Sequence, residues 1–344
     1  MTSAPELGGQ LLQGVSRSFY LTLKALPHGV REPLSLAYLL ARAADTMADT
    51  TRVGDDVRLE CLREFGRLVQ SEARDPLAEM ALCERMQLDF AALQTDASEA
   101  ALLQRLGDAF EAFRQAPASH QAAMRGVLGP IVHGQMRDIE RFPADGQVRA
   151  LSTAQELDDY TWLVAGCVGE FWTKLCAQEV TEAFSNEMPL ETLVEWGIRY
   201  GKGLQLVNIL RDVAKDLRMG RCYFPETELA AHGLTVTAVQ AEPSLLLPLM
   251  APWRERCREH LLCGLRYLDT VTHKRLLYAT SLPLLLGVRT LAAIELADWP
   301  TLAAGVKVSR AEVSKLLVDA GFAILRKNGI RRMAEQSLGA VGPS

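Results

Sequence analysis

The 344-residue sequence lacks several features that mark common classes of protein. Its net charge is −5 and it has no basic tail, which argues against a nucleic-acid partner, because such a partner requires a clustered basic face. Its seven cysteines include no C-x-x-C pair, and its six histidines form no H-E-x-x-H cluster, so a zinc site is not expected. We expect the cysteines to be reduced, small residues of the core.

Long hydrophobic segments are also missing. The longest uncharged run, Leu276–Val288, has 13 residues, whereas a membrane-spanning helix needs about 20 apolar residues. The first residues show no positively charged region followed by the apolar core of a signal peptide. We therefore expect a cytoplasmic protein, in which this run forms a buried helix that is broken or started at Pro283.

Helical periodicity dominates the remaining sequence, and no convincing alternating strand is found. Hydrophobic residues make up 49%, enough for a sizeable core, and no stretch rich in Pro, Gly or Ser divides the chain. The sequence predicts one all-α domain over residues 1–335 and a flexible tail over 336–344. Within it we expect one helix from Pro33 to about Thr50, one from about Glu191 to before Gly220, and a last one over Arg310–Met333.

Two pairs of aspartates stand four residues apart, Asp45–Asp49 and Asp212–Asp216. On a helix such residues share one face, about 6 Å apart along the axis. Two neighbouring carboxylates repel each other, and a hard cation with oxygen ligands would compensate them. The helix before Asp49 is apolar on nearly all sides, so its two carboxylates are expected to be buried at an internal cavity or its mouth.

Arginines accompany both aspartate pairs. Arg42 precedes the first pair, and Arg211, Arg218 and Arg221 surround the second. Because guanidinium groups bind phosphate bidentately, the combination predicts a diphosphate bridged to the protein through Mg²⁺. The competing interpretation is two solvated helix faces with intrahelical ion pairs.

Glycines inside helical patterns leave a second question open. Gly166 and Gly169 provide either room for a long apolar substrate or a close contact between two helices. Gly201-Lys202-Gly203 superficially resembles a nucleotide loop, but Leu206 replaces the last glycine and no strand precedes it, so Lys202 is taken as a solvated charge. The amphipathic segments Val57–Gln70, Leu77–Leu93 and Glu99–Gln115 show no chemistry.

These motifs together resemble the squalene/phytoene synthases, which are head-to-head prenyltransferases. The resemblance runs from about residue 14 to residue 325. The residues that carry it are Ser16-Arg-Ser-Phe, Tyr38 with Arg42-x-x-Asp45-x-x-x-Asp49, Tyr160-x-x-x-Val-Ala-Gly-x-Val-Gly169, and Gln205-x-x-Asn208-x-x-Arg211-Asp212-x-x-x-Asp216 followed by Gly220-Arg221-x-x-Phe-Pro225.

The resemblance implies an α-helical isoprenoid synthase bundle around a central apolar channel, and it implies roles for individual residues. Metal ligands would be Asp45, Asp49, Asp212, Asp216 and Asn208. The substrate diphosphates would be held by Ser16, Arg17, Ser18, Arg42, Arg211 and Arg221. Groups near the reacting carbons would be Tyr38, Tyr160 and Gln205, together with Arg42 and Arg211, and Tyr160 or the released diphosphate would steer a proton.

A basic segment bears on the cofactor. Gly305-Val-Lys307-Val-Ser-Arg310 lies in an expected loop, Pro300–Ser309, and resembles the segment that helps squalene synthases bind NADPH. The resemblance implies that Lys307 and Arg310, with Arg42 and Arg17, bind this cofactor. An ordinary solvated loop is the alternative. The resemblance also implies a strongly lipophilic product and hence peripheral contact with membranes.

Three hypotheses follow. The first is a squalene synthase, which joins two farnesyl diphosphates to presqualene diphosphate and reduces it with NADPH. The second is a dehydrosqualene or phytoene synthase, or an enzyme that stops at presqualene diphosphate. The third is a non-catalytic assembly factor, although such relatives typically lose the aspartate pairs, and both pairs are intact here. The sequence predicts neither the prenyl chain length nor the oligomeric state.

Overall fold

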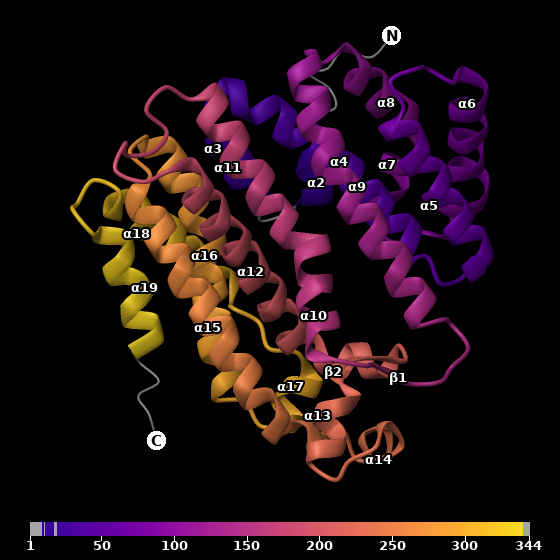
Figure 1. The fold of residues 1–344 in the computed structure, drawn as a ribbon, viewed down its shortest axis with the longest axis vertical. Helices are drawn as coiled ribbons and strands as arrows, with labels where there is room; N and C mark the ends of the chain where they lie inside the picture. The colour runs from indigo at the N-terminus through magenta and orange to yellow at the C-terminus, as the bar shows by residue number, and fades with distance from the viewer. Residues whose placement is uncertain (1–8, 10, 17–18, 340–344) are drawn as a thin grey trace. The chain divides into compact units, whose positions relative to one another are not determined.

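The structure of the chain is a computed structural model that describes residues 9, 11–16 and 19–339 (Figure 1). The chain forms two compact units, Met1–Ala144 and Asp145–Ser344, which we describe separately as unit 1 and unit 2. Helices make up most of the described residues of both units. The predicted all-α fold class is therefore confirmed.

Unit 1 is a set of helices packed around α4. Its α-helices are α2 (Leu12–Ser16), α3 (Phe19–Ala25), α4 (His28–Asp49), α5 (Asp55–Gln70), α6 (Pro76–Arg85), α7 (Ala97–Gln104), α8 (Leu106–Gln115) and α9 (Ala118–Arg141). A π-helical turn (Met86–Phe90) and a 3-10 turn (Ala91–Leu93) follow α6. The alanine- and leucine-rich faces of α4 are buried against α5, α7, α8 and α9. This packing fixes the helix that carries the first aspartate pair.

The start of α4 differs from the prediction. The helix begins at His28, five residues before Pro33, which lies inside it. Pro27 acts as the N-cap with φ −56° and ψ 154°, and its carbonyl accepts the first turn's N–H groups, from Val30 and Arg31. An internal proline costs the helix one hydrogen bond. Burial of Pro33 and its neighbours in the core offsets that loss.

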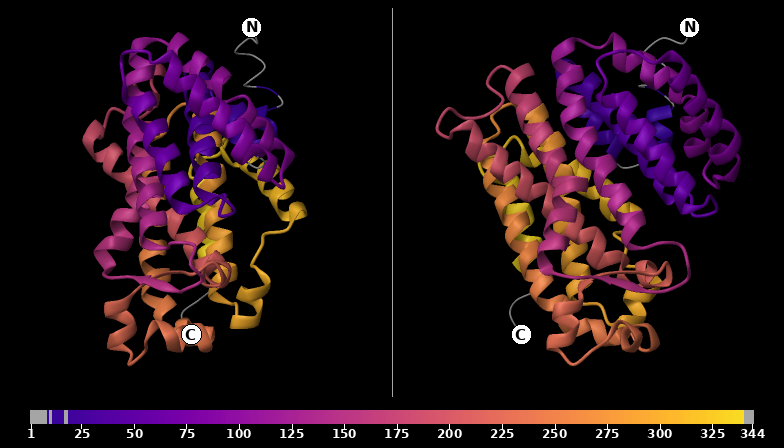
Figure 2. Two further views of the ribbon diagram at one scale, coloured as in Figure 1. Left: turned by 90° about the vertical axis from the view of Figure 1, so that its right-hand side faces the viewer. Right: turned by 45° about the vertical axis from the view of Figure 1, so that its right-hand side comes forward.

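Unit 2 is organised around the long helix α12. Figures 1 and 2 show α12 running beside α11 and α15, with α16 packed behind it. The elements of unit 2 are β1 (Arg149–Leu151), α10 (Ala154–Thr161), a π-helix (Trp162–Gly166), α11 (Cys167–Glu179), α12 (Leu190–Arg218), β2 (Arg221–Pro225), α13 (Glu226–Ala231), α14 (Val236–Ala241), α15 (Leu247–Thr270), α16 (Lys274–Glu295), α17 (Trp299–Ala304), α18 (Arg310–Ala323) and α19 (Gly329–Gly339).

Glycines allow α12 to approach closely both α11 and the π-helix that precedes it. A Cβ atom added at Gly169 would lie 1.9 Å from the carbonyl oxygen of Gly197, and one added at Gly201 would lie 2.3 Å from the carbonyl oxygen of Ala165. A Cβ atom at Gly166 would lie 3.0–3.3 Å from side chains of Trp162, Lys202 and Ile198. Of the two interpretations of Gly166 and Gly169, the structure supports close helix packing.

Two short strands are present although none was predicted. β1 and β2 pair in parallel, with Arg149 opposite Arg221 and Ala150 opposite Cys222. The strands have three and five residues, too few to show an alternating pattern in the sequence. Gly220, with φ 82°, turns the chain from the end of α12 into β2. This turn places Arg221 directly after the helix that carries the second aspartate pair.

The C-terminal prediction of one helix over Arg310–Met333 is wrong. The chain forms α18 and α19 instead, because Asn328 adopts the left-handed conformation (φ 55°). Gly329 then passes so close to α18 that a Cβ atom there would lie 2.1 Å from the carbonyl oxygen of Ala323. The expected loop Pro300–Ser309 contains part of the short helix α17. Helix α19 continues to Gly339, beyond the expected end of the domain at residue 335.

The apolar run around Pro283 forms part of one helix, α16, so the predicted break is wrong. The hydroxyl of Tyr200 donates to the carbonyl of Thr280 at 2.8 Å, which supplies a side-chain donor in the turn that the proline disturbs. Among the described residues, α16 is the one helix long and apolar enough to cross a bilayer. Most of that stretch is buried inside the protein, as in the core helix of a globular fold.

Candidate active site

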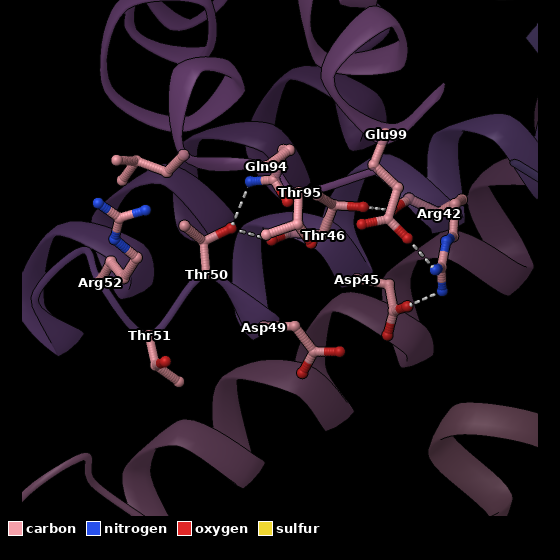
Figure 3. A pocket seen from close by; sticks show the side chains of 11 residues that line it. Arg42, Asp45, Thr46, Asp49, Thr50, Thr51, Arg52, Gln94, Thr95 and Glu99 are labelled. Atoms are coloured by element: carbon pink, nitrogen blue, oxygen red, sulfur yellow. Dashed lines mark hydrogen bonds and ion pairs between the residues drawn. The ribbon is translucent and has the colours of Figure 1, made fainter. Parts of the chain in front are cut away.

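The first aspartate pair lines a polar pocket of about 250 Å³ in unit 1 (Figure 3). The last two turns of α4, the loop after α4 and the segment leading into α7 form its walls. Its lining residues are Arg42, Asp45, Thr46, Asp49, Thr50, Thr51, Arg52, Leu93, Gln94, Thr95 and Glu99. Three carboxylates and two guanidinium groups face it, so the pocket is better suited to a cation than to a lone anion.

Arg42 makes ion pairs with two carboxylates of this pocket. Its Nη1 group lies 2.5 Å from Oδ2 of Asp45, and its Nη2 group contacts Glu99 of α7. Burial lowers the pKa of Arg42, but the charges of Asp45 and Glu99 outweigh this effect, so the pKa is raised on balance. Sequence reasoning missed Glu99, since a single glutamate on an amphipathic helix carries no signal that links it to α4.

The two carboxylates of this pair are more open than predicted. The side chain of Asp45 is 40% exposed, and Asp49 is exposed. The apolar faces of α4 are buried, but the face with these residues opens into the pocket. The inference that both carboxylates are buried is therefore wrong, while their place at a cavity agrees with the prediction.

The second aspartate pair lies near the C-terminal end of α12 in unit 2. Arg211 donates twice to Asp212, from Nε to Oδ1 at 2.9 Å and from Nη2 to Oδ2 at 2.6 Å. These hydrogen bonds, despite the opposing effect of burial, raise the pKa of Arg211. Asp216 is half-buried one turn further on. In both units an arginine is thus ion-paired to the first aspartate of its pair.

Two more candidate residues lie on the same helix. Asn208 is exposed, and its amide donates to Oε1 of Gln205 at 3.3 Å. With Asp212 and Asp216, these residues recur every three or four positions and so share one face of α12. These four candidate residues of unit 2 therefore form one polar stripe on α12.

Tyr160 of α10 stacks on Tyr223 of β2. The ring centroids are 5.0 Å apart with an angle of 21° between the planes, and the two hydroxyl oxygens are 3.3 Å apart. Tyr223 is buried and Tyr160 half-buried. Arg221, also half-buried, begins the same strand. Sequence reasoning did not identify Tyr223 as the partner of Tyr160.

A buried ion pair joins α10 to α12. Nζ of Lys202 lies 2.5 Å from Oδ1 of Asp158, and the lysine side chain is only 11% exposed. The prediction that Lys202 is a solvated charge is therefore wrong. Next to it, burial and the charges of Lys202 and Arg199 lower the pKa of His260 to about 4. This pair fixes the helix that carries Tyr160 against the helix that carries the second aspartate pair.

The N-terminal candidates are only partly described. The buried hydroxyl of Ser16 donates to the carbonyl of Leu12 at 2.5 Å, and the hydroxyl of Tyr38 donates to the carbonyl of Val15 at 3.2 Å. Arg17 and Ser18 lie outside the described residues. Tyr38 therefore ties α4 to α2, the helix that ends at Ser16.

The candidate cofactor residues lie on the surface of unit 2. Lys307 and Arg310 are both exposed, the first in the segment between α17 and α18 and the second at the start of α18. Ser309 caps α18, since its hydroxyl accepts the N–H of Glu312 while Glu312 accepts the N–H of Ser309. Capping of α18 thus explains why a serine, Ser309, lies between the two basic residues.

Each aspartate pair suits Mg²⁺ only when a substrate supplies further ligands. The described residues contain no group of three or more His, Cys, Asp or Glu side chains that could hold a metal ion. Mg²⁺ in proteins keeps several waters and binds through one or two carboxylates plus substrate phosphates. A pair of aspartates beside an arginine fits that mode of binding.

The helical fold and the two arginine-flanked aspartate pairs are the features expected of all-α synthases that act on diphosphate substrates. The model of the squalene/phytoene synthase family matches residues 12–312, and the chain belongs to this family. The family consists of head-to-head prenyltransferases of isoprenoid biosynthesis, which bind prenyl diphosphates and generally depend on Mg²⁺.

Relatives in the family differ in activity. The chain is 29% identical to the presqualene diphosphate synthase of Rhodopseudomonas palustris, over 72% of this chain and 74% of that protein. It is 28% identical to a bifunctional lycopene cyclase/phytoene synthase of Phaeosphaeria nodorum, over 67% of this chain and 36% of that protein. It is 25% identical to a squalene synthase of Eremothecium gossypii, over 83% of this chain and 61% of that protein. The chain thus spans about a third of the length of the bifunctional relative and about three fifths of the length of the squalene synthase.

Solved structures agree on the fold. A ligand complex of TcSQS has a TM-score of 0.71 at 18% identity, covering 98% of this chain and 97% of its own. The squalene synthase HpnC from Alicyclobacillus acidocaldarius has a TM-score of 0.53 at 19% identity, covering 85% of this chain and 93% of its own. At these identities the likeness establishes the fold alone.

Proposed function

We propose that this chain is a squalene synthase, which condenses two farnesyl diphosphates head to head to presqualene diphosphate and then reduces it with NADPH. The observation that carries the proposal is the repeated constellation of arginine and aspartate pair. Arg42 is ion-paired to Asp45, and Arg211 to Asp212, each with a second aspartate one turn on. Two diphosphates require two such sites.

In this proposal the arginines bind the diphosphate oxygens. Arg42, Arg211 and Arg221 would do so, with Ser16, Arg17 and Ser18 near the N-terminus. The metal ligands would be Asp45, Asp49, Asp212, Asp216 and Asn208. Bound Mg²⁺ would neutralise the negative charge that grows on a leaving diphosphate. The guanidinium groups stabilise the same charge through bidentate hydrogen bonds, so both the metal ligands and the arginines lower the barrier to ionisation.

Tyrosines and a glutamine would act beside the reacting carbons. The allylic cation must be shielded from water, and Tyr38, Tyr160 and Gln205 would line its surroundings. Ring closure to the cyclopropyl intermediate releases one proton, which we assign to Tyr160 or to the released diphosphate. The hydroxyl of Tyr223, 3.3 Å from that of Tyr160, offers a route for passing the proton on.

The reduction step depends on Lys307 and Arg310, which would bind NADPH together with Arg42 and Arg17. Two exposed basic residues three positions apart, with no ion pair to a described acid, suit a phosphate-bearing cofactor. The second candidate function omits this step. The relative from Rhodopseudomonas palustris, which aligns with nearly three quarters of its own length, is a presqualene diphosphate synthase, and it favours an enzyme that stops at that product.

A product assay tests these alternatives. Purified protein receives Mg²⁺ and labelled farnesyl diphosphate, with and without NADPH, and the lipids are identified by mass. Squalene formed only with NADPH supports the first proposal. Presqualene diphosphate or dehydrosqualene in both reactions supports the second, and turnover only with geranylgeranyl diphosphate indicates a phytoene synthase. No turnover with any substrate supports the non-catalytic assembly factor, which both intact aspartate pairs oppose.

We also propose that the protein works in the cytoplasm at an anionic membrane surface, where its product is released. Helix α18 and the turn after it expose an apolar stripe of Val318, Phe322 and Leu325, at 59%, 61% and 65% exposure. Arg326 and Lys327 follow the stripe and form no ion pair with a described acid. Apolar side chains next to unpaired basic ones suit a bilayer with acidic headgroups.

A further inference from the structure

Arg42 in the pocket of unit 1 is held by carboxylates from two helices (Figure 3). Asp45 lies three residues on in the same helix, whereas Glu99 comes from α7. The Nε atom of Arg42 is buried and has no hydrogen-bond partner. Both ends of the guanidinium are therefore fixed by anions of the protein before a substrate binds.

Glu99 is the better-protected partner of the two. Its side chain is 21% exposed, compared with 40% for Asp45. It lies in the first turn of α7, and the carboxylate of Asp96 caps that turn by accepting the N–H of Ser98 at 2.8 Å. Helix α7 itself packs against α4. The capped first turn of α7 and the packing of α7 on α4 together fix the position of Glu99.

The proposed function gives Asp45 a second task. As a metal ligand, its carboxylate would divide its two oxygens between Arg42 and a cation, so less of its negative charge would hold the guanidinium. An arginine held by Asp45 alone would then be held less firmly. Its long side chain would regain rotamer freedom just when it should bind the diphosphate.

We propose that Glu99 is a positioning residue, which holds Arg42 through its Nη2 group while Asp45 engages the metal. Held in this way, Arg42 would keep its guanidinium at the pocket and donate its remaining N–H groups to the diphosphate. This inference rests on the proposed function, because it requires that Arg42 bind a diphosphate and that Asp45 bind a metal. Glu99 itself contacts neither the metal nor the substrate.

Binding of inorganic diphosphate, measured by calorimetry with and without Mg²⁺, tests the inference without turnover. In the presence of Mg²⁺, Glu99→Ala should weaken diphosphate binding by about tenfold, the worth of one ordered charge-assisted hydrogen bond. Glu99→Gln keeps an oxygen acceptor in the same place and should recover most of that loss. If Gln and Ala weaken binding equally, Glu99 acts through its charge on the whole pocket, and the inference is overturned.

A double-mutant cycle separates positioning from a general loss of stability. Because Glu99 acts through Arg42, Glu99→Ala should change the diphosphate affinity of an Arg42→Ala protein by less than twofold. A full tenfold loss in both backgrounds would contradict the inference. In steady-state assays the same variant should raise KM for the prenyl diphosphate and leave kcat within about threefold, since the bound complex keeps Arg42 in contact.

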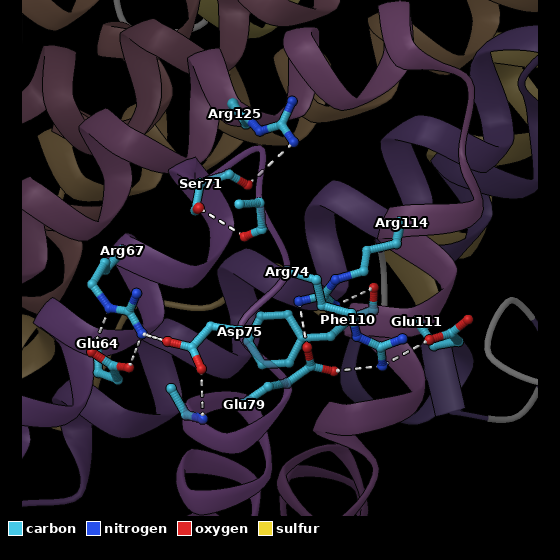
Figure 4. Close-up of polar contacts among 12 residues, drawn as sticks. Glu64, Arg67, Ser71, Arg74, Asp75, Glu79, Phe110, Glu111, Arg114 and Arg125 are labelled. Atoms are coloured by element: carbon cyan, nitrogen blue, oxygen red, sulfur yellow. Dashed lines mark hydrogen bonds and ion pairs between the residues drawn. The ribbon is translucent and has the colours of Figure 1, made fainter.

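A matched control is available elsewhere in unit 1. Arg67 is also shared by two carboxylates, Glu64 and Asp75, at 2.6 and 2.8 Å from its Nη2 group (Figure 4). None of the three lines the pocket. Glu64→Ala removes one carboxylate from an arginine in the same way as Glu99→Ala, and it should leave diphosphate affinity unchanged. Equal losses in both variants would show that the effect comes from stability.

The wild-type arm distinguishes failure of the inference from failure of the proposed function. Tight binding of diphosphate by the wild type with Mg²⁺ and equal binding by Glu99→Ala would overturn the inference alone. Absence of any Mg²⁺-dependent diphosphate binding by the wild type would overturn both.

Discussion

Replacing Gly169 with alanine should disturb the packing of α11 on α12 in unit 2. The added Cβ atom would lie 1.9 Å from the carbonyl oxygen and 2.4 Å from the carbonyl carbon of Gly197. These are backbone atoms of α12, which cannot rotate away as a side chain would. Since ordinary carbon–oxygen contacts are about 3.3–3.6 Å long, α11 and α12 would have to move apart by roughly 1.5 Å.

The expected loss follows from two opposing effects. Overpacking in a close-packed interior costs about 1–3 kcal/mol, and a clash with backbone belongs at the upper end. Alanine gains about 1 kcal/mol over glycine in a helix interior. The net loss is about 2 kcal/mol, and since each kcal/mol lowers Tm by about 2–4 °C in a unit of this size, we expect Tm to fall by roughly 4–8 °C.

Thermal unfolding followed by circular dichroism or calorimetry measures this change. The control is Gly321→Ala in α18, where the nearest atom to the added Cβ is a ring carbon of Tyr278 at 4.0 Å. That variant should be as stable as the wild type or more stable by up to about 1 kcal/mol. If Gly169→Ala had the same Tm as the control, close packing of α11 on α12 could not explain these glycines. The alternative interpretation, room for a substrate beside α11, would then be favoured.

Three further predictions concern pH, the metal site and the membrane. The folded-state pKa of His260 is about 4 and the ordinary value is 6.5, so the unfolded chain binds a proton first as pH falls, and the free energy of unfolding should decline between pH 6.5 and 4. His260→Gln should flatten that part of the profile of denaturant midpoint against pH. An identical profile in this variant would count against the burial of a neutral imidazole. Asp212→Asn should lower turnover at least about 100-fold in rates measured over a Mg²⁺ titration. Its Tm should be nearly unchanged, because the side chain is about a third exposed. Full activity of the variant at any Mg²⁺ concentration would refute the role of Asp212 as a metal ligand. The protein should sediment with phosphatidylglycerol vesicles but not with phosphatidylcholine vesicles. The double change Phe322→Ser with Leu325→Ser should abolish this sedimentation, and sedimentation that persists would exclude the apolar stripe of α18 as the membrane-binding surface.

Local geometry explains which parts of the site were predictable from sequence. Asp45 lies three residues after Arg42, so helical periodicity brings these two side chains together, whereas Asp212 is the immediate neighbour of Arg211 in the sequence. The four-residue spacing of each aspartate pair can likewise be recognised in the sequence. These relations need only the prediction that the segment is a helix, and the structure has both segments as helices.

Contacts between distant segments were not predictable in the same way. Glu99 reaches Arg42 across 57 positions, and Tyr223 reaches Tyr160 across 63. Nothing in the residues near either partner marks the contact, because it depends on how α7 packs on α4 and how Gly220 turns the chain into β2. The two short strands were missed for the same reason, since their pairing is a tertiary event.

Lys202 illustrates how tertiary packing reverses a local inference. The sequence predicts a solvated lysine here, because lysine is almost never fully buried unless it is paired. The structure shows that close approach between α12 and its neighbours uses Gly201, while Asp158 from α10 supplies the charge that a buried ammonium needs. Glycines in α12 therefore do more than relax the backbone. By admitting a neighbouring helix at short distance they bury the lysine between them, and the resulting ion pair fixes Tyr160's helix to the helix of Asp212 and Asp216.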